Sequence, residues 1–489
     1  MSVHCAPSSL SIQSSETVQD LQQTSARRSA NYKPSAWNSD FFKSLKTNDI
    51  VVHVFQRFKD KSGNFMESLC KDTKGLLSLY EASYLSFEGE NLMEEAKVFT
   101  TKHLKGIKGK IVDRDLVEQI NHALEMPLHH RMLRLGARWY IEAYGKRKDA
   151  NHLLLEMAKL DFNMVQSLYQ GELKDMSRWW EDLGLGKNLT FARDILMECF
   201  FWNVGIVFEP KFRDCRKSLT KLVALTTIID DVYDVYGYLD ELQLFTTAVA
   251  RWDVKAVDTL RDYMKLCFLA LYNTTNEMAY DILRQKGVNI IPYLTGATEK
   301  IVGFANGAVV LDMEETKVLP TVASAKGTPF ATSRHLPTST PENPVELLLK
   351  DLRLCLYNFF GPCKAQLTAS TGSPTPVFYK RRTRVSFAEL ERGESANSIV
   401  CYMHETGVFE QEARKYIYIL IEEAWKKMNE ERVAADSPFE KSFIETAANL
   451  ARICQCTYEN VDGHGALDNQ AKNLILSVII EPITLVQRE

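Results

Sequence analysis

The run Leu222-Val-Ala-Leu-Thr-Thr-Ile-Ile-Asp230-Asp231-Val-Tyr-Asp234 joins an apolar helical segment to three carboxylates. Ionised carboxylates at a buried surface are costly unless they are paired or bind a metal. At about 3.6 residues per turn, Asp230 and Asp234 lie one above the other and Asp231 flanks them. This face offers only oxygen ligands, which Mg²⁺ prefers, and protein-bound Mg²⁺ commonly recruits substrate phosphates. Taken alone, the run fits a solvated helix end as well as it fits a metal site. The surrounding sequence therefore decides between these two interpretations.

The composition is that of a globular protein without the charge pattern of a nucleic-acid binder. The 489 residues are 45% hydrophobic and 25% charged, and the net charge is −4. Ten cysteines without CxxC pairs indicate buried thiols rather than a disulfide framework. His129 and His130 follow Pro127 in a polar turn, which indicates a surface position. No apolar run has the length of a membrane span.

Residues 1–26 form a leader that we expect to be disordered. They contain seven serines, two acids and no Lys or Arg. Transit peptides are Ser-rich but also Arg-rich and poor in acids, so the leader fits half of that pattern. On this ground we expect a cytoplasmic protein.

Helical periodicity runs through the chain from about Phe65, and strand signals are scarce, which predicts an all-α fold. The charged break Gly145-Lys-Arg-Lys-Asp149 suits a junction between two helical domains, over residues 27–150 and 151–489. The main predicted helices cover residues 115–124, 132–144, 151–180, 190–208, 215–236, 239–252, 257–282, 396–407, 410–431, 439–456 and 471–480.

Residues 296–385 break this pattern. Eight of the chain's fifteen prolines lie there, clustered with Thr and Ser. Proline disrupts helix interiors, so the segment predicts a long loop or insert with a short helical part at 345–358. A structureless segment of this length is unusual inside a compact domain.

Further motifs accompany the acidic run in a fixed order. Arg193 lies 37 residues before Asp230, and Arg27-Arg28 precedes Trp37 with eight residues between. The others are Leu76-Leu-Ser-Leu-Tyr80-Glu-Ala-Ser, Ser386-Phe-Ala-Glu389-Leu-Glu-Arg-Gly393, Cys401-Tyr402-Met403 and Asp462-Gly-His-Gly465. Together with the DDxxD run they resemble a plant class I terpene synthase of the angiosperm group that makes monoterpenes, isoprene and some acyclic sesquiterpenes.

This resemblance implies an N-terminal helical barrel, here shortened, and a C-terminal class I terpenoid synthase α-bundle that holds the active site. It implies ionisation of a prenyl diphosphate with Mg²⁺ (or Mn²⁺), releasing diphosphate and a volatile, acyclic terpene. Geranyl diphosphate is the first expected substrate and farnesyl diphosphate the second. The implied metal ligands are Asp230, Asp231, Asp234 and Glu389. Arg193 would bind the diphosphate together with Asp230 and Asp234, because a guanidinium fork suits phosphate oxygens.

Three aromatic residues match family positions around the reaction pocket. Trp202 lies nine residues after Arg193, on the same predicted helix and beside Phe200 and Phe201. An aromatic face stabilises a carbocation as it does other cations. Tyr402 and Tyr458 would shape the cavity or accept a proton, with core packing as the alternative for both.

The chain departs from the family pattern in its N-terminal domain and at one metal motif. Several helices are missing between Trp37 and Phe58, so the remaining helices must expose apolar faces or repack. The family's second metal motif ends here in Glu389, but arginines at 381 and 382 and Val385 replace its other positions. Cations at ligand positions should repel Mg²⁺.

Two smaller observations concern the pocket and the diphosphate site. Residues 296–385 stand where the family has pocket-lining helices, and the abrupt edges of this segment suggest a reading-frame or splice change in a gene model. Ile195 stands where most relatives have a second arginine. This replacement should weaken the binding of diphosphate.

Two functions therefore stay open. The chain is a terpene synthase, or it is a catalytically impaired remnant that acts at most as a helical binding protein. A chain-elongating prenyltransferase fits less well, because such enzymes carry two Asp-rich motifs and lack the N-terminal domain. The expected partner is a small prenyl diphosphate, without nucleic acid or a membrane span, and the expected state is a monomer or weak homodimer. The resemblance adds the plastid as the alternative compartment.

Overall fold

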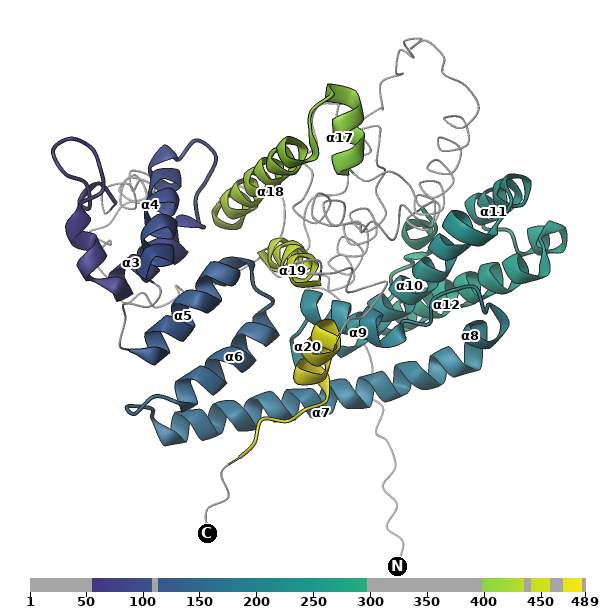
Figure 1. The fold of residues 1–489 in the computed structure, drawn as a ribbon. Coiled ribbons are helices and arrows are strands. Elements are labelled where there is room, and N and C mark those ends of the chain that lie inside the picture. The colour runs from purple at the N-terminus through teal and green to yellow at the C-terminus, as the bar shows by residue number, and fades with distance from the viewer. Residues whose placement is uncertain (1–54, 108–112, 297–397, 435–440, 458–468, 486–489) are drawn as a thin grey trace, which may run out of the picture. The chain divides into compact units, whose positions relative to one another are not determined.

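The structure is a computed structural model that describes residues 55–107, 113–296, 398–434, 441–457 and 469–485. The chain divides into two compact units, Met1–Arg57 and Phe58–Glu489. In the described part of the second unit, helices are joined by turns, and the only strand pairing is one bridge between Lys59 and Phe65 (Figure 1). The all-α prediction is confirmed there. The leader, the Pro-rich segment, Glu389 and Tyr458 lie outside the described residues.

The helices fall into three consecutive groups along the chain. The first group is α3 (Thr73–Ser83), α4 (Asn91–Ile107), α5 (Arg114–Glu125) and α6 (Leu133–Gly145). The second is α7 (His152–Leu183), α8 (Leu185–Asn188), α9 (Leu196–Ile206), α10 (Arg213–Asp231), η4 (Val232–Tyr236), α11 (Leu239–Arg251) and α12 (Asp262–Lys286). The third is α17 (Ser398–Thr406), α18 (Glu410–Val433), α19 (Lys441–Thr457) and α20 (Asn469–Ile479). Single 3₁₀ turns lie at Glu67–Lys71, Leu128–His130, Pro210–Phe212 and Val254–Thr259.

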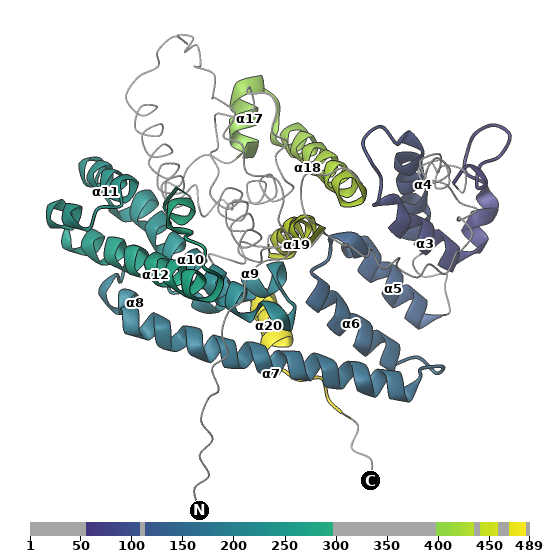
Figure 2. The same cartoon turned by 180° about the vertical axis from the view of Figure 1, so that it is seen from behind.

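The longest helix, α7, follows the predicted charged break and packs against α6, α9, α10 and α20 (Figures 1 and 2). Its N-terminus is capped by Asn151, whose side chain accepts hydrogen bonds from the N–H groups of Leu153 and Leu154. It ends at Gly184, whose φ of 65° is a conformation that glycine adopts without strain. Both ends therefore follow from local sequence signals.

Helix α9 lies in the core and is mostly apolar around its circumference, with Glu198 and Asn203 as its polar residues. Its residues from Cys199 to Ile206 are all buried, as expected for a helix without a polar face. It packs against α7, α10, α19 and α20. Its C-terminal carbonyls are satisfied by buried side chains: Asn449 Nδ2 donates to Ile206 at 3.1 Å and Arg216 Nη1 to Val207 at 2.6 Å.

A glycine permits the close approach of α9 to α19. A Cβ atom at Gly205 would lie 2.6 Å from Cβ and Cγ1 of Ile453. We expect Gly205→Ala to lower the free energy of unfolding by about 1–3 kcal/mol, because atoms near the rigid Ile453 backbone cannot move aside freely. The control is Gly171→Ala on α7, where nothing lies within 4 Å of the new atom. Urea unfolding followed by circular dichroism measures both, and equal effects would contradict the close-packing explanation.

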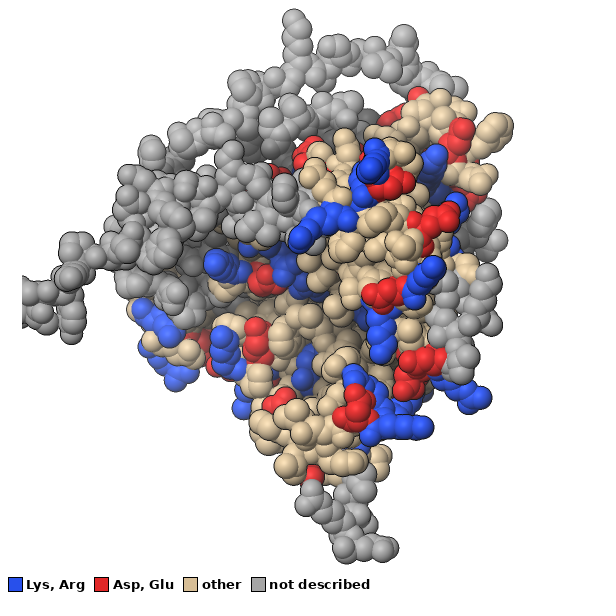
Figure 3. All heavy atoms as spheres, turned by 90° about the vertical axis from the view of Figure 1, so that its left-hand side faces the viewer, with Lys and Arg blue, Asp and Glu red and all other residues tan. Residues whose placement is uncertain are grey.

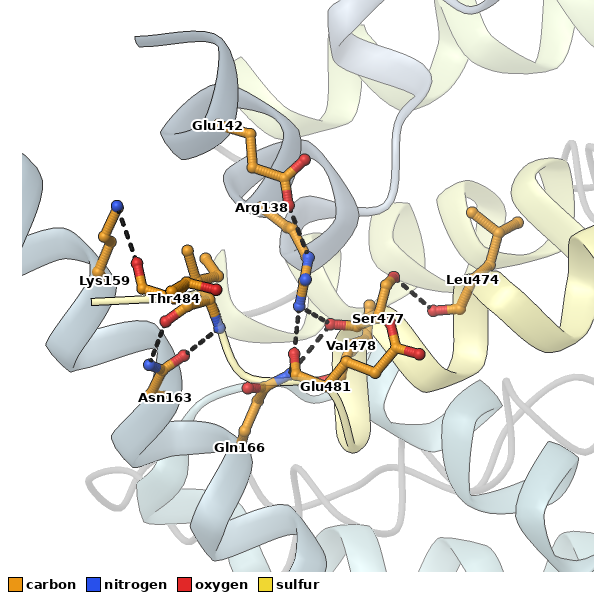
Figure 4. Close-up of polar contacts among 11 residues, drawn as sticks. Arg138, Glu142, Lys159, Asn163, Gln166, Leu474, Ser477, Val478, Glu481 and Thr484 are labelled. Carbon is orange, nitrogen blue, oxygen red and sulfur yellow. Dashed lines mark hydrogen bonds and ion pairs between the residues drawn. The ribbon is translucent and has the colours of Figure 1, made fainter. Parts of the chain in front are cut away.

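The C-terminal segment is fastened to α6 and α7 by a group of polar contacts (Figure 4). Gln166 Nε2 donates to the carbonyls of Ser477, Val478 and Glu481. Arg138 Nη1 donates to two of the same carbonyls, those of Ser477 and Glu481. The Asn163 amide and the Ile483 backbone exchange two hydrogen bonds of 2.8 Å. These contacts satisfy the last carbonyls of α20 and hold it on α7.

The first group of helices contacts α18 and α19 mainly through polar and aromatic side chains. Lys97 of α4 pairs with Glu422 of α18 at 2.5 Å, and Figure 3, which faces the side of the molecule with α3 and α4, shows basic and acidic side chains interspersed. His130 stacks on Trp425 at 4.1 Å and is only 2% exposed. The surface position predicted for His130 is therefore wrong, because α18 covers the turn. No helix among the described residues is long and apolar enough to cross a membrane.

Candidate functional site

The acidic run follows a buried stretch of α10. Every residue of α10 from Leu222 to Ile229 is buried, and the hydroxyls of Thr226 and Thr227 bond to carbonyls one turn earlier. The side chain of Asp230 is 18% exposed and that of Asp231 is 8% exposed. A solvated helix end is therefore the wrong interpretation for these two carboxylates, and each needs compensation for the water it has lost.

The helical register changes within the acidic run. The α-helix ends at Asp231 and continues as the π-helix η4, in which the N–H of Gly237 donates to the carbonyl of Val232 at 2.7 Å. The predicted i to i+4 alignment of Asp230 and Asp234 assumed one continuous α-helix, and the backbone leaves that register after Asp231; the alignment stays a prediction. The structure does not describe the Asp234 side chain. π turns of this kind often occur at functional sites.

Arg193 meets Asp231 through three groups. Its backbone N–H donates to Oδ2 at 2.8 Å, its Nε donates to Oδ1 at 2.7 Å, and its Nη2 lies 2.6 Å from Oδ1. The same Nη2 lies 3.7 Å from Oδ2 of Asp230. The guanidinium balances the buried carboxylates and remains one-third exposed. The sequence prediction that Arg193 and the acidic run form one site is thus consistent with these contacts.

The prediction that Arg193 and Trp202 share one helix is wrong. Residues 189–195 are not helical, and α9 begins only at Leu196. The reason lies in the contact just described, because the Arg193 N–H that an α-helix would use internally is bonded to Asp231 instead. Arg193 therefore sits on a connecting segment rather than on a helix face.

Residues on both sides of Arg193 anchor this connecting segment. Asp194 accepts a hydrogen bond of 2.9 Å from the indole Nε1 of Trp180 on α7. Phe191 stacks on Tyr236 of η4 with a ring separation of 3.7 Å, and Tyr263 of α12 packs edge-on against both rings. Sequence analysis missed this anchoring, since no spacing signal connects Trp180 to Asp194 across the turn at Gly184. Two adjacent tryptophans at the end of a helix were the available signal.

The pocket aromatics that the sequence predicted are placed in packed surroundings. Trp202 is 1% exposed, and its neighbour Phe200 lies edge-on to Tyr169 at 6.5 Å. Tyr402 on α17 is half-buried and stacks on Tyr416 of α18 at 4.2 Å. The roles of Trp202 and Tyr402 in a reaction stay predictions, as does that of Tyr458.

The carboxylate oxygens of Asp230 and Asp231 suit a hard cation in kind, but they do not make a complete ligand set. Asp230 offers carboxylate oxygens, the donors that Mg²⁺ prefers, and its side chain is 18% exposed. Asp231 uses both oxygens for Arg193. Among the side chains that the structure describes, no three His, Cys, Asp or Glu lie together as a metal site. A metal site here would need further ligands, for which the sequence predicts Asp234 and Glu389.

Burial shifts the pKa of two groups, Glu198 and Tyr233. Burial raises the pKa of Glu198 on the first turn of α9, and the charge of Asp194 raises it further. Burial also raises the pKa of Tyr233, whose hydroxyl shares a hydrogen bond of 2.7 Å with Thr246. Tyr233 therefore remains protonated at neutral pH.

Comparisons with known proteins give a consistent result. The model "Terpene synthase family, metal binding domain" matches residues 181–317, "Terpene synthase, N-terminal domain" matches 36–124, and "Terpene synthase family 2, C-terminal metal binding" matches 386–427. A chloroplastic isoprene synthase of Populus alba is 47% identical over 445 residues, which are 90% of this chain and 73% of that protein. A chloroplastic alpha-thujene synthase of Litsea cubeba is 46% identical, over 89% of this chain and 73% of that protein.

Two solved structures are similar to this chain in fold as well as in sequence. The crystal structure of isoprene synthase from grey poplar leaves (Populus x canescens) has a TM-score of 0.75 and 44% identity, covering 89% of this chain and 80% of that one. A second structure of this enzyme, in complex with three Mg²⁺ ions and dimethylallyl-S-thiolodiphosphate, has a TM-score of 0.74 and 45% identity, covering 88% of this chain and 81% of that one. The chain is a member of the plant terpene synthase family, in its isoprene and monoterpene synthase group.

Proposed function

We propose that this chain is a terpene synthase, a lyase that ionises a prenyl diphosphate and converts the carbocation to a volatile terpene with release of diphosphate. The observation that carries the proposal is the contact of Arg193 with Asp231 and Asp230 at the end of α10. It brings a guanidinium and carboxylates together inside the region matched by the family's metal binding domain. A diphosphate with bound cations requires this combination of charges.

The side chains have distinct roles in this proposal. Arg193 would bind diphosphate oxygens with the exposed third of its guanidinium, and Asp231 would hold Arg193 in place in addition to the metal contact predicted for it. Asp230 and Asp234 would hold Mg²⁺ (or Mn²⁺), with Glu389 as a further ligand. When bound, Mg²⁺ neutralises the diphosphate and makes it a better leaving group. The relative with three Mg²⁺ ions supports this choice of cofactor.

Three aromatic side chains would surround the hydrocarbon part of the substrate. Trp202 would face the cation, and Tyr402 and Tyr458 would shape the cavity or accept a proton. Geranyl diphosphate is the proposed substrate and farnesyl diphosphate the second choice, with an acyclic product. The dimethylallyl analogue bound by the poplar enzyme adds dimethylallyl diphosphate to the substrates that should be assayed.

A catalytically impaired isoform is the second candidate, and a specific observation favours it. The matched ranges of the two metal-binding models leave residues 318–385 uncovered, and the arginines at 381 and 382 fall in this gap. Recovering the transcript tests whether the segment is real. A helical segment in frame at 296–385 would identify a gene-model error, and an unchanged Pro-rich segment would exclude that error.

The experiment is a Mg²⁺-dependent assay with dimethylallyl, geranyl and farnesyl diphosphates and headspace analysis of the products. We expect volatile product that disappears in Asp230→Ala and persists in Asp240→Ala, an exposed carboxylate in the first turn of α11. Chelation of Mg²⁺ should also abolish product. Equal turnover by both variants would exclude the proposed site, whereas no turnover by a folded wild-type chain would favour the impaired isoform.

Domain division and location also belong to the proposal. The N-terminal and metal-binding models lie on either side of residues 145–149, which supports domains at 27–150 and 151–489. The chloroplastic relatives favour the plastid, and the cytoplasmic location stays a prediction. The position of a fluorescent fusion in leaf cells separates the two compartments.

A further inference from the structure

Three aromatic rings join the segment that carries Arg193 to the segment that carries the acidic run. We call them the three-ring cluster: Phe191, Tyr236 and Tyr263. The rings of Phe191 and Tyr236 are parallel, with an interplanar angle of 1° and a centroid separation of 3.7 Å. Tyr263 of α12 stands edge-on to both, with its ring centroid 6.0 Å from that of Phe191 and 5.1 Å from that of Tyr236. Three separate parts of the chain therefore meet next to the segment of Arg193.

The place of the parallel stack in the sequence gives it a consequence for the site. Phe191 precedes Arg193 by two residues, and Tyr236 follows Asp234 by two residues. The same two segments are joined a second time where Arg193 contacts Asp231. The backbone of Asp234 therefore lies between two fixed points, Asp231 and Tyr236, on the π turn η4. The contact that holds Tyr236 thus limits how far the backbone of Asp234 moves.

The π turn η4 is restrained on two sides. Its Tyr233 is 3% exposed and shares a hydrogen bond of 2.7 Å with Thr246 of α11. Its Tyr236 is 49% exposed and lies on the ring of Phe191. Because a π turn is a rare conformation, we expect contacts on both sides to maintain it. The inner contact belongs to the core, and the outer one belongs to the segment of Arg193.

Tyr263 ties the three-ring cluster to the neighbouring helices. Its hydroxyl donates to Oε2 of Glu241 on α11 at 2.7 Å, and Oε1 of the same carboxylate accepts from Nε of Arg261 at 2.8 Å. The Glu241 side chain is 12% exposed. Burial raises the pKa of Tyr263 and the hydrogen bond to Glu241 raises it further, so the phenol stays protonated and remains a donor at neutral pH. The edge-on ring is therefore held from α11 as well as from α12.

The exposure of Tyr236 separates a positioning role from a role in folding. About half of this residue is exposed to solvent. Replacing it by leucine leaves no large buried cavity, so the free energy of unfolding should change little. An effect of such a replacement on ligand binding would therefore report on the geometry of the site.

We propose that Phe191 and Tyr236 are positioning residues for the diphosphate site. Their stack, supported by Tyr263, holds the backbone of Asp234 at the distance from Arg193 that a cation-bound diphosphate requires. The inference rests on the proposed function, in which Asp234 holds Mg²⁺ and Arg193 binds diphosphate. It adds that one aromatic contact sets the two sides of the site relative to each other.

The first test measures the binding of inorganic diphosphate by calorimetry, with and without Mg²⁺. With Mg²⁺ present, we expect Tyr236→Leu to weaken binding by about two- to tenfold, the range that corresponds to the loss of one aromatic pair. Without Mg²⁺ the binding should not change, because Arg193 keeps its contacts with Asp231. Tyr236→Phe keeps the stacked ring and should restore the binding of the wild type.

A matched control removes an aromatic stack elsewhere. Tyr140 is 58% exposed and stacks on Tyr144 of α6 with a centroid separation of 6.0 Å. Tyr140→Leu should leave diphosphate binding unchanged. Phe191→Leu should weaken the Mg²⁺-dependent binding as Tyr236→Leu does, and the two losses should not add in the double variant, because each removes the same stack. Urea unfolding followed by circular dichroism shows whether each variant keeps the stability of the wild type.

The second test observes the backbone without any ligand. Hydrogen–deuterium exchange of peptides that span residues 231–237 should be faster in Tyr236→Leu than in the wild type and in Tyr236→Phe, because the π turn loses its outer contact. Equal exchange in Tyr236→Leu and the wild type would overturn the inference, and so would equal Mg²⁺-dependent binding of diphosphate by the two. A folded wild type that binds no diphosphate in either condition would overturn the proposed function together with the inference.

Discussion

Asp231→Ala is expected to lower kcat/KM for the preferred prenyl diphosphate by about 100-fold or more, because it releases the residue that would bind the leaving group. Arg193 contacts Asp231 through its backbone N–H and through two guanidinium nitrogens. Removing the carboxylate frees the connecting segment on which Arg193 lies and removes the three contacts that hold Arg193 on Asp231. Initial rates at saturating Mg²⁺ measure the effect, with Asp240→Ala as the control.

A double-mutant cycle separates positioning of Arg193 from direct metal binding. If Asp231 acts by holding Arg193, the Arg193→Ala and Asp231→Ala losses should not add, because each removes the same contact. The Mg²⁺ concentration for half-maximal rate should then be similar in the wild type and in Asp231→Asn, which keeps an oxygen acceptor. A large rise in the Mg²⁺ requirement together with additive losses would identify Asp231 as a metal ligand instead.

The same contact can be measured without turnover. Inorganic diphosphate binding by calorimetry, in the presence and absence of Mg²⁺, reports on Arg193 even if the chain is catalytically impaired. We expect Asp231→Ala to weaken diphosphate binding in both conditions. Unchanged binding, with a folded variant, would contradict the positioning role.

The helices were predictable where local signals set their ends. The capping by Asn151 and the left-handed Gly184 delimit α7, and the domain junction expected at the charged break before it stays a prediction. The predicted end of α12 at Ile282 was too early, since the helix runs to Lys286 and stops at Gly287, which has a φ of 70°. Local chemistry therefore accounts for both ends of α7 and for the C-terminal end of α12.

The site geometry depended on contacts between distant residues, which periodicity cannot show. Phe191, Ala192 and Ile195 keep an apolar spacing that suits a helix, yet the Arg193 N–H bonds to a residue 38 positions away. The π turn after Asp231 likewise follows from packing at Gly237, where a Cβ would lie 2.7 Å from Leu242 Cδ2 and 2.9 Å from the Val232 carbonyl. The sequence therefore identified the motif residues, but it did not predict how Arg193 and the acidic run are arranged in space.

The second large effect concerns a buried ion pair that joins α7 to α10. Glu172 and Arg216 are both fully buried and form a two-point contact, with Nε–Oε2 and Nη2–Oε1 distances of 2.7 and 2.6 Å. Arg216 Nη1 also donates to the carbonyls of Val207 and Glu209, after the end of α9. The pair therefore fixes α9 and α10 relative to α7 at the C-terminal end of α9, the end opposite to the segment that carries Arg193.

Glu172→Gln is expected to lower the free energy of unfolding by about 3–5 kcal/mol, because it leaves the Arg216 charge buried without its partner. The matched control is Glu118→Gln, which breaks the exposed Lys146–Glu118 pair and should cost at most about 1 kcal/mol. The double variant Glu172→Met with Arg216→Met should be more stable than Glu172→Gln alone, since no unpaired charge remains. Urea unfolding followed by circular dichroism measures all three. Equal stability of Glu172→Gln and Glu118→Gln would mean that water reaches Arg216 and that the pair does not hold the three helices together.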